Sequence, residues 1–184
     1  MHKLPGLVIG RFQPPHLEHE RYYLTALQKC DFLWIGIVTP EVGVNQNICD
    51  SGKHRLTQLS NPFSYHHRLL MIKGLLESKG IPRSRFEFIP FPMDNLNLVH
   101  SYTSPQDVQC FVSILDEWSL QKAARLAAAG FKVESLWTDY DERTSGSDIR
   151  KLIMENKTEW QKYVPKFVEN YILTHQLDKI LLQK

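Results

Sequence analysis

The sequence has few cysteines, no large charge excess and no long apolar run, and each absence excludes a class of protein. The three cysteines, Cys30, Cys49 and Cys110, are odd in number and far apart, so neither a disulfide framework nor a CxxC zinc site is indicated. No run of about 18 apolar residues occurs, and no apolar leader precedes the first predicted strand. We therefore expect a reduced, soluble, cytoplasmic protein without a membrane partner.

The charge balance argues against a dedicated nucleic-acid binder. There are 22 basic and 20 acidic side chains, which gives a formal net charge of +2. A local basic pocket is still compatible with that balance, so we expect small-molecule partners and no nucleic acid. With 184 residues and a 42% hydrophobic composition, the chain is long enough for one well-packed domain and too short for two ordinary ones.

Short apolar segments alternate with amphipathic segments along most of the chain. Apolar segments predict strands at 7–11, 32–38, 86–89, 111–115 and 132–137, and amphipathic segments predict helices at 17–29, 64–79 and 119–129. This alternation predicts an α/β fold with a parallel sheet of about five strands covered on both faces. After Ser147 only helices are predicted, at 147–155 and 165–175. We expect one domain over 1–184, with a core at 1–145 and a C-terminal helical segment at 146–184.

Several side chains are expected to serve packing rather than chemistry. In helix 64–79, Ser64 is the predicted cap and the predicted buried stripe consists of Leu69, Leu70, Ile72, Leu75 and Leu76. Core packing is also the expected role of Trp34, Trp137 and Trp160. Asp139, Asp141 and Glu142 are interpreted as turn and capping residues, and no metal site is predicted from them.

The most informative segment is Gly10-Arg11-Phe12-Gln13-Pro14-Pro15-His16-Leu17-Glu18-His19. It follows an apolar strand directly. Gly10 allows a close backbone approach, and the two prolines exclude helix until about His16. His16 and His19 then fall one turn apart on one face of the next helix. With Arg11 and the unpaired N–H groups of the helix start, they predict a cationic pocket for a phosphate, built without a P-loop.

Three further segments carry basic or hydroxyl side chains, each with a plainer alternative. Thr144-Ser145-Gly146-Ser147-Asp148-Ile149-Arg150 is suited to a helix cap and, with Arg150 one turn on, to a phosphate. Arg68 is either a solvated helix residue or an anion ligand. Lys53, His54 and Arg55 lie in a long loop at 40–63 and are either solvated or part of a lid.

Three of these motifs occur together and in order. They are Gly10 to His16 with His19, Asn61-Pro62-Phe63 leading to Arg68, and Thr144 to Arg150. Together they resemble the archaeal-type nicotinamide-mononucleotide adenylyltransferases of the HxGH nucleotidyltransferase superfamily, from about residue 4 to about 180. The resemblance implies a Rossmann-like sheet with the nucleotide at the carboxyl edge of the strands, where such sheets bind ligands. Relatives of this kind are often oligomeric, which leaves a homo-oligomer open.

The resemblance also implies roles for individual residues. It implies catalytic roles for His16, His19, Arg11 and Arg150, with His19 best placed to stabilise charge on the transferred α-phosphate. It implies that ATP is bound by Gly10, Arg11, Phe12, Gln13, His16, His19, Ser145, Gly146, Ser147 and Arg150, and that Mg²⁺ bridges the phosphates. It places the acceptor's phosphate at Arg68, with His67, Asp94 and Tyr102 as further acceptor-binding candidates.

The chain departs from the family pattern at four points. Glu18 replaces the glycine of HxGH, and His66-His67 stands where archaeal relatives tend to have Gly-Glu. Residues 94–104 lack the tryptophan that stacks on nicotinamide. Either Tyr102, His100 or the more distant Trp118 takes that role, or the acceptor has no pyridinium ring. Asp116-Glu117-Trp118-Ser119 replaces an Asn-containing turn that contacts the nucleotide.

Three hypotheses follow from the motifs and the departures. The first is adenylyl transfer from ATP to nicotinamide mononucleotide or a close analogue, with release of pyrophosphate. The second keeps nucleotidyl transfer but changes the partners, for instance to CTP and another phosphate or phosphonate metabolite. The third is a catalytically silent nucleotide-binding domain, suggested by Glu18.

Overall fold

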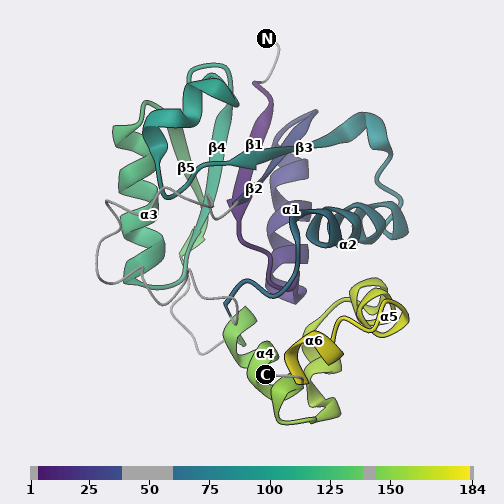
Figure 1. Cartoon of the computed structure of the whole chain (residues 1–184). Coiled ribbons are helices and arrows are strands. Elements are labelled where there is room, and N and C mark those ends of the chain that lie inside the picture. Colours follow the sequence, from purple (N-terminus) through teal and green to yellow (C-terminus); the bar gives the residue numbers. More distant parts are fainter. Residues whose placement is uncertain (1–3, 39–59, 139–143, 183–184) are drawn as a thin grey trace. The chain divides into compact units, whose positions relative to one another are not determined.

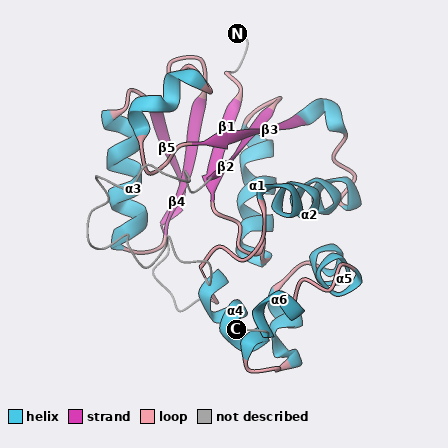
Figure 2. Ribbon diagram, in the orientation of Figure 1, coloured by secondary structure: helices cyan, strands magenta, loops and turns pink. Residues whose placement is uncertain are grey.

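The computed structural model describes residues 4–38, 60–138 and 144–182 (Figures 1 and 2). The strands are β1 (Gly6–Gly10), β2 (Leu33–Val38), β3 (Phe86–Phe91), β4 (Gln109–Ile114) and β5 (Lys132–Thr138). The α-helices are α1 (Leu17–Lys29), α2 (Tyr65–Ser78), α3 (Glu117–Ala128), α4 (Gly146–Met154), α5 (Lys166–Thr174) and α6 (Lys179–Leu182). Short 3₁₀ segments are η2 (Arg83–Arg85), η3 (Leu96–Ser101) and η4 (Thr158–Tyr163).

The described strands form one parallel sheet in the order β3-β2-β1-β4-β5, which confirms the predicted Rossmann-like α/β fold. Strand β1 is central, and Leu7, Val8 and Ile9 are almost completely buried because the sheet is covered on both faces. The chain moves one way across the sheet from β1 to β2 and the other way from β4 to β5. Since such crossovers are right-handed, α1 and α3 cover opposite faces.

The chain divides into two compact units. The sheet unit contains the described residues 4–10, 21–38 and 82–138. The helical unit contains the described residues 11–20, 60–81 and 144–182, so it holds the segment that follows β1, helix α2 and the C-terminal helices. The predicted division into a core at 1–145 and a helical segment at 146–184 stays a prediction.

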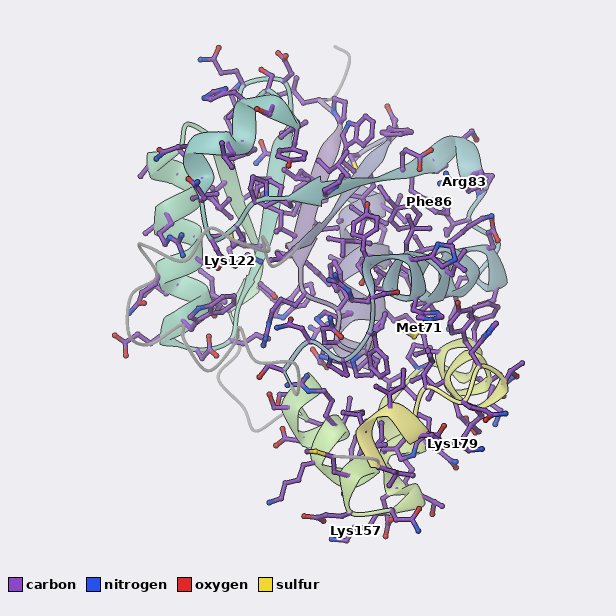
Figure 3. All side chains as sticks on the ribbon, in the orientation of Figure 1. Met71, Arg83, Phe86, Lys122, Lys157 and Lys179 are labelled. Carbon is purple, nitrogen blue, oxygen red and sulfur yellow. The ribbon has the colours of Figure 1, made fainter. Side chains whose placement is uncertain are left out.

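The sheet splits at the carboxyl end of β1. Strand β1 pairs with β2 along its whole length, from Gly6 to Gly10, but with β4 only at Gly6 and Leu7. Beyond that point side chains replace strand pairing: the Tyr22 hydroxyl donates to the Phe111 carbonyl, and Lys122 Nζ donates to the Ile9 carbonyl at 2.5 Å. Figure 3 shows Lys122 on α3. The split lies at the switch point of the strand order, where open α/β sheets bind ligands.

The structure differs from the prediction in the burial of two tryptophans and in the end of β3. Trp160 is buried, whereas Trp34 and Trp137 are only partly buried, with Trp34 packed against the sheet core. Strand β3 continues through Pro90 to Phe91, two residues beyond the predicted end. A proline is tolerated there because β3 is an edge strand and its missing N–H costs no ladder bond.

The buried face of α2 agrees only in part with the predicted one. Ile72, Leu75 and Leu76 are buried as expected, but Leu69 and Leu70 are half-buried. Their places in the core are taken by Arg68 and Met71, which are 2% and 0% exposed. The face is rotated because Arg68 is held inside by hydrogen bonds and because Phe167 of α5 packs directly over Gly74.

Some predicted features lie outside the described residues. These are Cys49, the Lys53-His54-Arg55 run and the group of Asp139, Asp141 and Glu142. Within the described ranges, none of the helices has the length and apolar character needed to cross a membrane.

Candidate active site

The segment Arg11–His16 leaves the carboxyl end of β1 and turns sharply before α1 begins. Phe12 has a φ of 54°, a left-handed conformation that a bulky side chain adopts only where its surroundings impose it. Its ring is 1% exposed, and the peptide bond between Gln13 and Pro14 is cis. All residues from Phe12 to His16 are buried, so the segment Arg11–His16, called the phosphate segment below, is packed into the helical unit.

The two histidines lie together at the start of α1, as their spacing predicts. Their ring centroids are 3.8 Å apart, and the rings of His19 and Phe12 meet nearly at right angles, with centroids 4.9 Å apart. The main-chain N–H of His16 donates to Nδ1 of His19 at 3.3 Å. Because Nδ1 accepts, neutral His19 holds its proton on Nε2, and Nε2–H can donate to a phosphate oxygen.

His16 is neutral at pH 7. It is 7% exposed, and burial lowers its pKa to about 4, an effect that nearby Asp148 partly opposes. In the protein without a ligand, His16 can therefore donate only through the N–H of its neutral ring. Glu18, the residue in the glycine position of the motif, is half-buried in the first turn of α1.

Helix α2 is joined to this segment by a buried arginine. Ser64 caps the helix by accepting from His67 N–H. Arg68 donates from Nη1 to the Arg11 carbonyl at 2.8 Å and from Nε to the Ser64 carbonyl at 3.3 Å. Burial lowers the Arg68 pKa to about 10, so the guanidinium remains charged at neutral pH. A solvated Arg68 is excluded.

The side chain of Gln13 is joined to the main chain of Phe63. Gln13 Nε2 donates to the Phe63 carbonyl at 2.9 Å, and the Phe63 N–H donates to Gln13 Oε1 at 3.0 Å. Gln13 is 3% and Phe63 1% exposed. Both polar groups of the amide are therefore used by the protein itself.

Helix α4 supplies the third part of the site. Ser145 and Asp148 form a capping box in which Asp148 Oδ2 accepts from the Ser145 N–H and hydroxyl. These hydrogen bonds lower the pKa of Asp148. Gly146 lies so close to the segment after β1 that a Cβ there would be 3.1 Å from the Gln13 carbonyl.

Arg150, one turn further along α4, also contacts the segment Arg11–His16. It is 5% exposed, donates from Nη1 to the Gln13 carbonyl at 2.6 Å, and donates from Nη2 to Ser147 Oγ at 3.1 Å. Burial lowers its pKa, and Asp148 opposes that shift. The Ser147 hydroxyl accepts from Arg150, so its own proton can still be donated to an anion.

All three sequence motifs therefore meet within the helical unit. Arg68 and Arg150 reach the main-chain carbonyls of Arg11 and Gln13, and Gln13 reaches Phe63. Two guanidinium groups, the His19 ring and the N-terminus of α4 lie against this short segment, which contributes a third guanidinium from Arg11. The arrangement can hold a polyanion and stabilise negative charge that develops on it.

The acceptor-binding candidates are divided between the two units. His67 Nδ1 lies 3.1 Å from the hydroxyl of Tyr171 on α5, and its ring is 6.1 Å from that of His175. Burial and the neighbouring histidines His66 and His175 lower its pKa. Asp94 and Tyr102 are exposed and belong to the sheet unit, where Tyr102 ends η3.

The motif Asn61-Pro62-Phe63 was recognised in the sequence, but neither the main-chain role of Phe63 nor the contact of Tyr171 with His67 was predicted. Phe63 takes part through its main chain, which leaves no signal in a side-chain pattern. Tyr171 could have been found from the i, i+4 spacing of Phe167, Tyr171 and His175, whose rings follow one another along α5.

Comparison with known proteins decides the family, although no family model matches the chain. Phosphonoformate cytidylyltransferase from Streptomyces viridochromogenes is 31% identical over 174 residues, which cover 95% of this chain and 93% of that enzyme. Nicotinamide-nucleotide adenylyltransferase from Saccharolobus solfataricus is 33% identical over 186 residues, with 96% and 94% covered. The chain belongs to the HxGH nucleotidyltransferase superfamily.

Solved structures agree with the fold. A bifunctional NMN adenylyltransferase/ADP ribose pyrophosphatase from Francisella tularensis matches with a TM-score of 0.64 and 17% identity. The match covers 100% of this chain and 53% of that one, so the chain spans about half the length of the bifunctional protein. With both relatives above named as enzymes that transfer a nucleotidyl group, this member of the superfamily is a nucleotidyltransferase acting on small molecules.

Proposed function

We propose that the protein transfers the nucleoside monophosphate of a triphosphate donor to a phosphate or phosphonate oxygen of its acceptor. The observation that carries this proposal is the junction of three motifs on Arg11–His16, with the His19 ring and the α4 N-terminus beside it. The acceptor oxygen attacks the α-phosphorus, the bond from that phosphorus to the bridging oxygen breaks, and pyrophosphate leaves. An acceptor phosphate is ionised near neutral pH, so no proton has to be removed.

Catalysis would then come from positioning and charge stabilisation, without a protein nucleophile. His19 would donate from Nε2 to the α-phosphate oxygen on which negative charge increases. Arg11 and the first N–H groups and Ser147 hydroxyl of α4 would hold the β- and γ-phosphates. We propose that Mg²⁺ arrives on the triphosphate as part of the substrate.

The roles proposed for Arg150 and Arg68 are narrower than the family pattern implies. Both donate to main-chain carbonyls of the phosphate segment, so they would hold that segment in shape while adding positive charge. Ser145 would act as the cap of α4, because its N–H and hydroxyl already bind Asp148.

The first donor and acceptor pair we propose is ATP with nicotinamide mononucleotide, as in the name of the archaeal relative. The second is CTP with a compact phosphonate, as in the name of the Streptomyces relative. The second pair is favoured by the lack of tryptophan in residues 94–104 and by the His66-His67 pair, whose second ring faces Tyr171.

A panel of reactions tests the proposal. The protein is incubated with Mg²⁺ and ATP or CTP, each with nicotinamide mononucleotide or phosphonoformate, and pyrophosphate release and product mass are measured. We expect release from one donor and acceptor pair and none when either partner is omitted. Nucleotide binding by calorimetry without turnover in any of the four reactions would support a catalytically silent domain instead.

A further inference from the structure

Gln13 is placed to act on the rest of the site rather than on a ligand. Its side-chain amide is 3% exposed and makes reciprocal hydrogen bonds with the main chain of a residue 50 positions away. Its own carbonyl accepts from Arg150 at 2.6 Å. This one residue therefore contacts the other two motifs of the site, and its amide nitrogen and amide oxygen each already bond to the protein.

The partner of the Gln13 side chain lies at the start of α2. Phe63 immediately precedes Ser64, the cap of α2, and the Ser64 carbonyl accepts from Arg68 Nε at 3.3 Å. Arg68 is the residue that the family resemblance places at the acceptor's phosphate, and its Nη1 donates to the Arg11 carbonyl at 2.8 Å. The phosphate segment and the start of α2 are thus joined twice, once by an amide pair and once by a guanidinium.

The conformation that these bonds hold is a strained one. Phe12, between Arg11 and Gln13, has a φ of 54°, which is costly for a bulky residue. A segment in such a conformation depends on its surroundings. A ligand that favours the strained conformation would therefore also favour the position of Phe63 and of the α2 cap.

We infer that Gln13 is a positioning residue through which donor binding at Arg11–His19 and acceptor binding at the start of α2 reinforce each other. This inference rests on the proposed function. A triphosphate on the phosphate segment orders Phe63 through the amide pair, so the acceptor meets a prearranged Arg68. By linkage, a bound acceptor raises the affinity for the donor by the same factor.

Hydrogen exchange tests the inference without knowledge of the true donor base or acceptor. Magnesium tripolyphosphate is added to the wild type and to Gln13→Glu, whose carboxylate can accept from the Phe63 N–H but cannot donate to the Phe63 carbonyl. In the wild type we expect slower exchange in residues 11–19 and in 61–70. In Gln13→Glu we expect slower exchange in 11–19 only. Gln121→Glu, an exposed change on α3, is the matched control and should behave as the wild type.

Kinetics provide the second measurement, with whichever donor and acceptor pair the wild type uses. The KM for the acceptor is measured at low and at saturating triphosphate. Coupling between sites is typically fivefold or more, so we expect a decrease of about that size in the wild type and none in Gln13→Ala or Gln13→Glu.

Each outcome has a defined meaning. Two results overturn the inference and leave the proposed function intact. In the first, tripolyphosphate still slows hydrogen exchange at 61–70 in Gln13→Glu. In the second, it slows exchange at 11–19 but not at 61–70 in the wild type. Absence of protection at 11–19 in the wild type overturns the proposed function, and the inference falls with it. Thermal melts of both Gln13 variants show whether the fold is retained, and Gln13→Ala provides the second test if Gln13→Glu does not fold.

Discussion

Arg150 donates from Nη1 to the main-chain carbonyl of Gln13 at 2.6 Å, across 137 positions of sequence. The bond joins the last motif of the chain to the first, and both partners are buried. The Arg150 guanidinium therefore helps to hold the conformation of the phosphate segment, Arg11–His16, before any ligand is bound.

Arg150→Met should lower both stability and turnover. The variant leaves a buried carbonyl without a donor, which costs about 1–3 kcal/mol in the free energy of unfolding. Denaturant unfolding measures that loss, and pyrophosphate release measures turnover. Lys151→Met changes the exposed neighbour on the same helix and is expected to stay within about 0.5 kcal/mol of the wild type. Equal stability of the two variants would show that the Arg150 bond does not hold the segment.

His19→Ala should reduce turnover by two orders of magnitude or more while the protein stays folded. Removal of one donor to a developing charge costs about 2.7–4 kcal/mol in the barrier. The rate of pyrophosphate release is compared with that of Leu17→Ala, an exposed change in the same helical turn. A His19→Ala protein with a near-normal rate would remove His19 from the mechanism.

Binding of a triphosphate near pH 6 should be accompanied by proton uptake at His16. The imidazole is neutral there because its pKa is lowered to about 4. A polyanion beside it stabilises the protonated form and raises that pKa, so the complex binds more protons than the separate partners. Calorimetry in two buffers of different ionisation enthalpy counts the protons. His16→Asn should take up fewer protons than the wild type, and an identical count in both proteins would contradict the assignment.

The elements and motifs with strong local signals were predictable from the sequence. Alternating apolar strands and amphipathic helices, the Ser64 cap and the His16 to His19 spacing all depend on residues a few positions apart. The burial of Arg68 was not predictable, because a charged residue is buried only where distant main-chain carbonyls accept its protons. The pairing of Gln13 with Phe63 was not predictable either, because Phe63 contributes only main-chain atoms, which every residue type has.

The role of the α4 start was only half predictable. Ser145 followed by Asp148 has the pattern of a helix cap, and the structure shows that cap. The same pattern also suits a phosphate, and only the hydrogen bonds to Asp148 show that the Ser145 N–H and hydroxyl are already used. Local sequence could not decide between two uses that require the same side chains.

Lys122→Met should lose stability relative to the wild type as the pH rises from 8 to 10.5. Burial lowers the pKa of Lys122 from 10.5 to about 8. Below pH 8 the side chain is therefore protonated in both the folded protein and the unfolded chain. The folded protein then carries the free-energy cost of a buried charge. Between pH 8 and 10.5 the folded protein loses this proton while the unfolded chain keeps it. The unfolded state then binds more protons, and wild-type stability rises with pH.

The difference between wild type and variant isolates this contribution. Between pH 8 and 9 the wild type should gain about 1 kcal/mol relative to Lys122→Met, because one pH unit corresponds to roughly 1.4 kcal/mol at full titration. Urea unfolding at pH 7, 8 and 9 measures it, with the exposed Lys132→Met as control. A difference that does not change with pH would show that Lys122 keeps an ordinary pKa.

Gly74→Ala should destabilise the helical unit although alanine favours helix. A Cβ at position 74 would lie 1.9 Å from Cζ of Phe167, so the Phe167 ring, or α5 with it, would have to move away from α2. Overpacking of this kind costs about 1–3 kcal/mol, more than the roughly 1 kcal/mol that alanine gains over glycine in a helix. Thermal unfolding of Gly74→Ala is compared with that of Lys73→Ala on the same helix. The double variant Gly74→Ala/Phe167→Leu should recover most of the loss, because the smaller side chain makes room for the added methyl group. A single variant that is more stable than the wild type would show that Phe167 does not pack on Gly74 in solution.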